Sequence, residues 1–266
     1  MQAVTGVFQN RFDAEQALDR AYKTGIPEDR ITLLTPGSVD SVNREVQTVP
    51  VDTTEQPGMG RAIGALVGGG IGLTGGSLLL ALVPGLGPVT ALGLLGAAIL
   101  GAAGATVGAT AAGKLESATS QGLPEDEIFV YEDALRKGRT VLVALASDRD
   151  EAERLTDLMR TANAESVDAA RDQWWIGLRG AEESHYQISG RRFSEDEQFF
   201  RLGFEAALHA RNRCREFDQI SAEMDATLED VKRQYPGKDV EEPFLQGYRR
   251  GREYYQKLCD ENPKAA

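Results

Sequence analysis

The alternation of apolar and polar positions predicts two strand–helix–strand units, separated by a long uncharged segment. Residues 3–8 and 30–35 are short apolar runs typical of strands, and residues between them recur at helical spacing. Asp13 is the predicted N-cap of that helix and Gly25 its C-cap signal. Residues 1–35 therefore form the first half of the predicted fold, and the aperiodic residues 36–59 form a linker.

Residues 115–175 repeat the pattern after a short additional helix. The nearly continuous apolar run at residues 140–146 predicts a strand. Asp148 and Glu151 form a capping box for the amphipathic helix that follows. Residues 166–170 then predict the last strand of this second half.

These two halves predict an α+β fold of the ferredoxin-like, or split βαβ, type, with an insertion between its second and third strands. Those two strands are hairpin neighbours in this plan. The two ends of the insertion must therefore lie close together, as the ends of a hairpin do.

The insertion, residues 60–114, is predicted as a helical hairpin, since residues 62–113 contain no charged side chain. Each arm is about 22 to 25 residues long, which as helix is about 33 to 38 Å and enough to cross a bilayer. The sequence thus predicts a transmembrane hairpin. The predicted turn between its arms contains Pro84, Gly85, Gly87 and Pro88.

Small residues recur at every fourth position in both arms, a spacing that lets helix backbones approach closely. In water such glycines weaken a helix by roughly 1 kcal/mol each relative to Ala, which favours a membrane or a tightly packed site. Two alternatives stay open: a buried hairpin in a soluble protein, and a Gly/Ala-rich segment that self-associates. The predicted helix-packing residues are Gly60, Gly64, Gly68, Gly72, Gly76, Gly93, Gly101 and Gly113.

Residues 182–266 predict a separate helical module, with capping boxes at Ser194 and Glu197 and at Asp239 and Glu242. Aromatic and small residues at positions i, i+3, i+4 and i+7 predict close packing of two helices; a ligand-stacking surface is the alternative. The repeat consists of Phe200, Gly203, Phe204 and Ala207 against Phe244, Gly247, Tyr248 and Gly251.

The net charge and the candidate binding residues limit the partners and ligands that we expect. The net charge of -12 and the pI near 4.8 argue against nucleic acid as a partner. Arginines of the helical module alternate with acids and predict solvated helix faces, with anionic lipid headgroups as the alternative ligand. Cys214 and Cys259 have no metal-ligand spacing and predict two thiols, one disulfide being the alternative.

The two histidines, His185 and His209, match no metal motif, and the sequence contains no nucleotide-binding motif after a strand. His185 with Glu183 and Tyr186 is a weak acid–base constellation, and a structural role for this histidine is the preferred interpretation. We therefore expect no enzyme activity, no catalytic residue, no cofactor and no metal.

Several segments resemble the bacterial heat-induced general stress protein domain, namely Val4-Thr5-Gly6-Val7-Phe8, Asp13-Ala14-Glu15 and Gly25-Ile26-Pro27. The Gly-rich segment and the run Gly122-Leu123-Pro124-Glu125 are similar to those of membrane-associated relatives. The resemblance covers residues 3–171. It implies a stress-linked bacterial role and carries no established reaction.

Two functional hypotheses follow. The first is a non-enzymatic, membrane-anchored interaction protein of the stress response, with the lipid bilayer as partner and self-association through the glycine-rich helices. It would sit in the inner membrane with its other parts on the cytoplasmic side. The alternative is a soluble or peripheral ferredoxin-like module that senses a small ligand and oligomerises through the hairpin.

Overall fold

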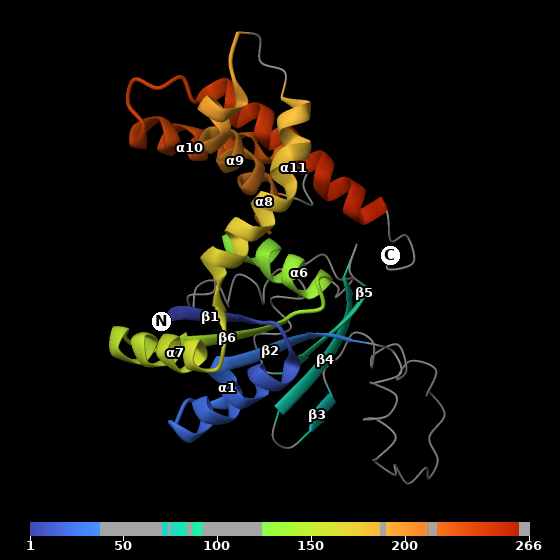
Figure 1. Ribbon diagram of the computed structural model, residues 1–266, viewed down its shortest axis with the longest axis vertical. Coiled ribbons are helices and arrows are strands. Elements are labelled where there is room, and N and C mark those ends of the chain that lie inside the picture. Colours follow the sequence, from blue (N-terminus) through green and yellow to red (C-terminus); the bar gives the residue numbers. More distant parts are fainter. Residues whose placement is uncertain are drawn as a thin grey trace.

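The structure is a computed structural model that describes residues 1–37, 71–73, 76–83, 87–92, 124–186, 190–210, 212 and 217–260. A sheet unit and a helical unit lie one above the other (Figure 1). Their elements in chain order are β1 (Gln2–Phe8), α1 (Arg11–Lys23), η1 (Glu28–Arg30), β2 (Ile31–Pro36), β3 (Ile71–Leu73), β4 (Gly76–Val83), β5 (Gly87–Leu92), η3 (Glu125–Glu127), α6 (Ile128–Arg136), β6 (Thr140–Ala146), α7 (Arg149–Thr161), β7 (Glu165–Ser166), α8 (Val167–His185), α9 (Phe193–Leu208), α10 (Phe217–Gln234) and α11 (Glu241–Asp260).

The described strands form one sheet in the order β3-β4-β5-β2-β6-β1-β7, and each neighbouring pair is antiparallel. Strand β6 lies between β1 and β2, so these two strands run in the same direction. The register of β1 with β6 extends over the whole of β1. The structure thereby confirms the coarse prediction of a fold that mixes helices with an antiparallel sheet.

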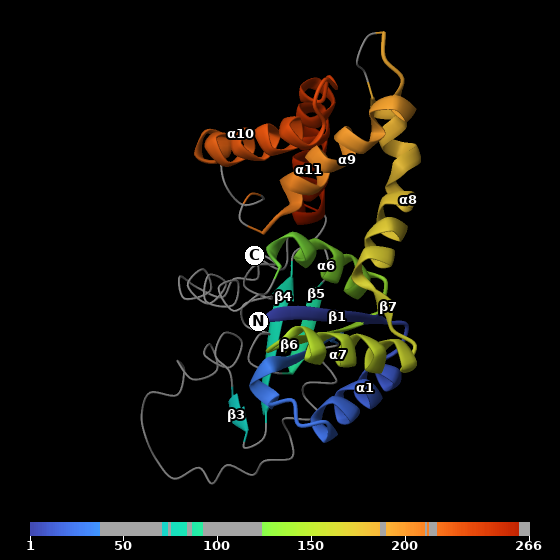
Figure 2. The same ribbon diagram turned by 90° about the vertical axis from the view of Figure 1, so that its left-hand side faces the viewer.

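Both faces of the central strands are covered. Helices α1 and α7 lie on one face, and α6 with the helical unit lies on the other (Figures 1 and 2). Successive residues of β6 alternate between two cores, with Val143 in one and Leu142 and Ala144 in the other. A strand buried on both sides needs apolar side chains on both sides, which explains the continuous apolar run of β6.

Three of the predicted helix starts can be compared with the observed caps. The capping box predicted at Ser194 and Glu197 is wrong, since α9 begins at Phe193 and its N-cap residue makes no side-chain cap hydrogen bond. Asp148 caps α7 as predicted, because its side chain accepts a hydrogen bond from the Glu151 amide at 2.8 Å. Helix α1 instead begins earlier than predicted, since the Asn10 side chain caps it by accepting from the Asp13 amide at 2.9 Å. Asparagine and aspartate are about equally good caps, so composition alone does not choose between them.

The last strand is shorter than predicted. The sequence predicts it over residues 166–170, but β7 ends at Ser166. The Ser166 hydroxyl accepts from the Ala169 amide at 3.2 Å and so starts α8. A serine that caps a helix ends the strand before it.

The helical hairpin predicted for residues 60–114 is wrong wherever the segment is described. Gly72 lies in β3, Gly76 begins β4, and Gly87 and Pro88 belong to β5. A continuous apolar run such as residues 78–83 fits a strand as well as a helix. Here it pairs with β5, which in turn pairs with the edge of β2. Outside the described residues lie Gly60, Gly64, Gly68, Pro84, Gly85, Gly93, Gly101 and Gly113.

The membrane predictions are corrected for the same reason. Among the helices of the described ranges, none is both long enough and apolar enough to cross a bilayer. This finding contradicts the predicted transmembrane hairpin and the predicted inner-membrane location.

Helix α8 is continuous from the sheet unit into the helical unit (Figure 2). In the helical unit α9 and α11 pack closely, as the sequence repeat predicts. A Cβ placed on Gly203 would lie 1.9 Å from the Phe244 carbonyl oxygen, and one on Gly247 would lie 1.9 Å from that of Phe200. The two backbones are therefore in direct contact at this crossing.

Candidate functional site

The sheet unit and the helical unit meet at α6, a helix with seven of its residues buried. One buried cluster contains Val7 and Val141 of the sheet together with Phe200 and Phe204 of α9. The two units therefore share a core. We call this contact region, formed by η3, α6, α8 and α9 with the adjoining part of β1, the junction.

Aromatic rings fill the junction. The ring centroids of Phe129 in α6 and Trp174 in α8 are 4.8 Å apart, and Trp174 lies 5.9 Å from Phe204. Trp175 continues the cluster to Phe200 at 6.2 Å. Tilted and edge-to-face ring pairs of this kind contribute roughly 0.5–1.5 kcal/mol each beyond their burial. Any separation of the two units would therefore be costly.

A buried hydroxyl links the sheet to the junction. The Tyr131 Oη atom donates to the Glu127 carboxylate at 2.6 Å and lies 3.0 Å from Thr5 Oγ1 in β1. Burial, more than the nearby carboxylate of Glu127, raises the pKa of Tyr131 well above its ordinary value. Burial also raises the pKa of Glu127, although the Tyr131 hydroxyl partly offsets this effect. Tyr131 thus stays a neutral donor between two elements.

Arg171 of α8 provides the second polar connection. Its Nη2 atom donates to the Asp126 carbonyl oxygen at 3.3 Å, and its Nη1 atom lies 3.9 Å from the Glu205 carboxylate in α9. The guanidinium also lies over the Phe129 ring at 5.8 Å. One side chain therefore connects η3, α6 and α9.

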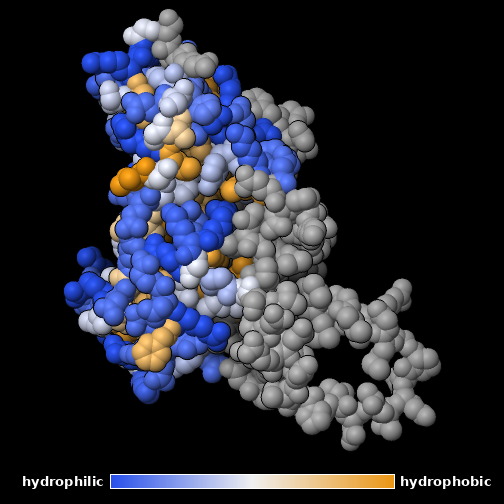
Figure 3. Space-filling view, turned by 45° about the vertical axis from the view of Figure 1, so that its right-hand side comes forward, coloured by the Kyte–Doolittle hydropathy of each residue, from blue (hydrophilic) through white to orange (hydrophobic). Residues whose placement is uncertain are grey.

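Several arginines predicted on solvated faces are instead structural partners. Arg250 of α11 donates two hydrogen bonds to Glu182 of α8, at 2.8 and 3.0 Å, and the two side chains are only 15% and 4% exposed. A bidentate pair of this kind fixes the angle between its helices. Arg191 is similarly tied to Asp196, next to the Tyr186 hydroxyl. The described residues on the face seen in Figure 3 are mostly hydrophilic.

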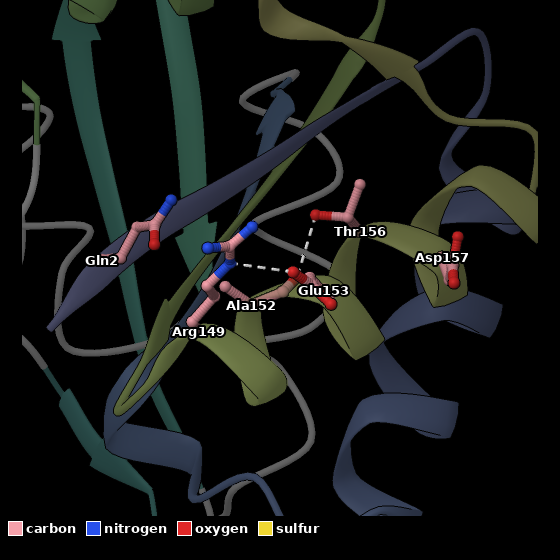
Figure 4. Close-up of a pocket in the computed structure, with 6 residues that line it drawn as sticks. All are labelled: Gln2, Arg149, Ala152, Glu153, Thr156 and Asp157. Carbon is pink, nitrogen blue, oxygen red and sulfur yellow. Dashed lines mark hydrogen bonds and ion pairs between the residues drawn. The ribbon is translucent and has the colours of Figure 1, made fainter.

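A shallow hollow of about 470 Å³ lies at the start of β1, on the side of α7. Gln2 lies opposite α7 residues, among them Arg149, Glu153 and Asp157 (Figure 4). Arg149 donates to Glu153 at 3.0 Å, and the side chains are 87% and 66% exposed. A small ligand here would keep most of its contact with water, so the hollow alone offers little affinity.

The weak acid–base constellation of the sequence is not assembled. His185 Nδ1 lies 2.7 Å from the Ala181 carbonyl oxygen, Glu183 pairs with Arg179, and the Tyr186 hydroxyl bonds to Asp196. In the described ranges no group of three or more His, Cys, Asp or Glu side chains is placed to hold a metal. Cys259 is a thiol, and Cys214 lies outside the described residues.

Comparison of the chain with protein-family models, curated proteins and solved structures finds no match. The resemblance to the heat-induced general stress protein domain stays a prediction. We therefore infer the function from the junction.

No sequence motif marks Tyr131, Trp174 or Trp175 as residues of the junction. Only one local signal pointed to the junction: Glu127 precedes Tyr131 by four residues, which places both on one face of a helical turn. The contacts of Arg171 with η3 and α9 join segments more than thirty positions apart, beyond the reach of a local pattern.

Proposed function

We propose that the chain is a non-enzymatic regulatory module, in which a ferredoxin-like unit senses a small ligand and the helical unit responds. The observation that carries this proposal is the shared core at the junction, where α6 packs between the sheet and the helices. The strand order β7-β1-β6-β2, with α1 and α7 on one face, supports the ferredoxin-like assignment.

The junction is suited to transmitting a structural change from one unit to the other, because each of its polar contacts connects different elements. A shift of β1 changes the distance between Thr5 and Tyr131, and Tyr131 lies on the helix that touches both units. Arg171 then connects η3 and α6 to α9. Coupling between sites travels through such contiguous packing and hydrogen-bond networks when the elements have two arrangements.

The charged groups of the junction favour a regulatory role over a catalytic one. Glu127, Asp126 and Glu205 each have a partner in Tyr131 or Arg171. A stress-linked role, implied by the family resemblance, is part of the same proposal and concerns the conditions under which the ligand appears.

Tyr131→Phe tests the proposal because it keeps the ring and removes only the hydroxyl. Thr5 and Glu127 lose their shared partner, at a cost of about 1–3 kcal/mol. We expect the amides of α9 and α11 to exchange with solvent faster, although no contact within the helical unit has changed. Hydrogen exchange measured by mass spectrometry reports this.

Tyr22→Phe in α1 is the matched control, with the same chemical change on the opposite sheet face. Trp174 and Trp175 are the only tryptophans of the chain and both are buried at the junction, so their fluorescence reports its integrity independently. Unchanged exchange in α9 and α11, with exchange accelerated only in the sheet unit, would overturn the proposed coupling.

A further inference from the structure

One edge of β1 pairs with a neighbouring strand along only part of its length. Residues Gln2 to Phe8 all pair with β6, whereas β7 pairs only with Gly6 and Val7. Residues 2–5 therefore have a strand neighbour on one side alone within the described part of the chain. In Figure 2, β1 crosses in front of the other strands, between α6 and α7.

The hollow beside Gln2 lies at the same end of β1. Strand β7 ends at Ser166, where the chain turns into α8. Helix α7 extends along β1 beyond the two residues that pair with β7. The hollow lies between Gln2 and α7, at the end of β1 that β7 does not reach (Figure 4). Strand edges with unpaired backbone groups are templates for another strand.

Residues 2–5 also lack the usual protection of an edge. Their sequence, Gln-Ala-Val-Thr, contains no charged side chain and no proline. Natural edge strands are commonly guarded by lysine, proline or a bulge. An edge without these residues is open to pairing with another strand.

We propose that this edge of β1 pairs antiparallel with the same edge of a second copy of the chain, joining two sheets about a twofold axis. The charged side chains of α7 favour a second copy of the chain as the source of the pairing strand. Arg149 lies at the start of α7 and Asp157 two turns later, both beside the hollow. Twofold pairing places Arg149 of each copy opposite Asp157 of the other, with the two Glu153 side chains between them. Arg149, which donates to its own Glu153 at 3.0 Å, then lies between a carboxylate of each copy.

The direction of α7 supports this complementarity. The hollow brings the start of α7 together with Gln2, and a Cβ on Gly6 would lie 3.0 Å from Met159 Sδ near the helix end. Helix α7 therefore runs in the same direction as β1, so antiparallel strands bring antiparallel helices with them. A self-complementary patch is what an isologous dimer requires. This contact is independent of the signalling role proposed above.

Charge exchange in the full-length chain tests the dimer. Arg149 and Asp157 are 87% and 71% exposed, so Arg149→Glu and Asp157→Arg leave the fold intact. Each variant alone places like charges at two symmetric contacts and should weaken dimerisation by about tenfold. A mixture of the two variants restores both attractions and should dimerise like the wild type. Sedimentation velocity over a concentration series measures this.

Arg233→Glu in α10 is the control, an exposed arginine far from this edge, and should leave dimerisation unchanged. Hydrogen exchange supplies a second readout, since the amides of residues 2–5 should become protected as the concentration rises. A wild type that stays monomeric overturns the proposal. So does a dimer that both charge variants leave unaffected, or one without protection at residues 2–5.

Discussion

Gly247→Ala tests whether the crossing of α9 and α11 depends on direct backbone contact. The new Cβ would lie 1.9 Å from the Phe200 carbonyl oxygen and 2.7 Å from its carbon. Ordinary contact of a Cβ begins near 3.4 Å, so the helices must separate by about 1.5 Å at this point. Backbone atoms cannot avoid the clash by changing rotamer.

Two terms of opposite sign determine the result. Alanine is a better helix former than glycine by about 1 kcal/mol. Against this, separation loosens rings that are almost completely buried, those of Phe200, Phe204, Phe244 and Tyr248. Overpacking costs about 1–3 kcal/mol, and a clash with backbone belongs at the upper end. We therefore expect a net destabilisation of about 2 kcal/mol.

Gly177→Ala and Gly180→Ala are matched controls, because a Cβ at either position of α8 meets nothing within 4 Å. They keep the gain in helix propensity without the clash, so each should stabilise the protein by up to about 1 kcal/mol. Urea denaturation followed by circular dichroism and tryptophan fluorescence measures all three variants. A Gly247→Ala protein as stable as the Gly177→Ala protein would refute the reasoning.

Two carboxyl groups predict opposite pH dependences, both measurable by urea denaturation at a series of pH values. The Ser147 amide and hydroxyl, with Arg30, lower the pKa of Glu151 from 4.5 to about 2, so its stabilisation is present above pH 4.5 and is lost as the pH falls towards 2. Glu151→Gln should destabilise the protein at neutral pH and flatten this acid limb; an unchanged limb contradicts the assignment. Burial raises the pKa of Glu127, so its folded carboxyl binds the proton more tightly and stability increases as the pH falls through the raised pKa. Glu127→Gln should remove that increase, and its persistence would point to another group.

The central strands and helices of the sheet unit were predictable because the residues that begin and end them are local sequence signals. The strand at residues 140–146 has the predicted bounds, since Gly138 precedes it with φ of 75° and Asp148 caps the next helix. The left-handed backbone at Gly138 suits glycine, so the sequence marks the end of α6 unambiguously. Short apolar runs between such signals leave little freedom.

The ion pairs that connect the helices were not predictable because their partners are distant in sequence. Arg250 and Glu182 are 68 positions apart, and neither lies in a motif. A buried arginine pair and a solvated arginine look the same in a helix that also carries acids. Only the packing of α11 against α8 decides which arginines lose water.

Small residues at four-residue spacing were interpreted correctly in one place and wrongly in another. In α9 and α11 charged side chains mark the solvent face, which fixes the helical period and makes Gly203 and Gly247 a packing surface. Around Gly72 and Gly76 no charged side chain marks either face, so a period of two fits as well as 3.6. Glycine spacing therefore indicates helix packing only where polar residues define the opposite face. An uncharged segment is recognisably hydrophobic, but its sequence does not distinguish the helical period from the strand period.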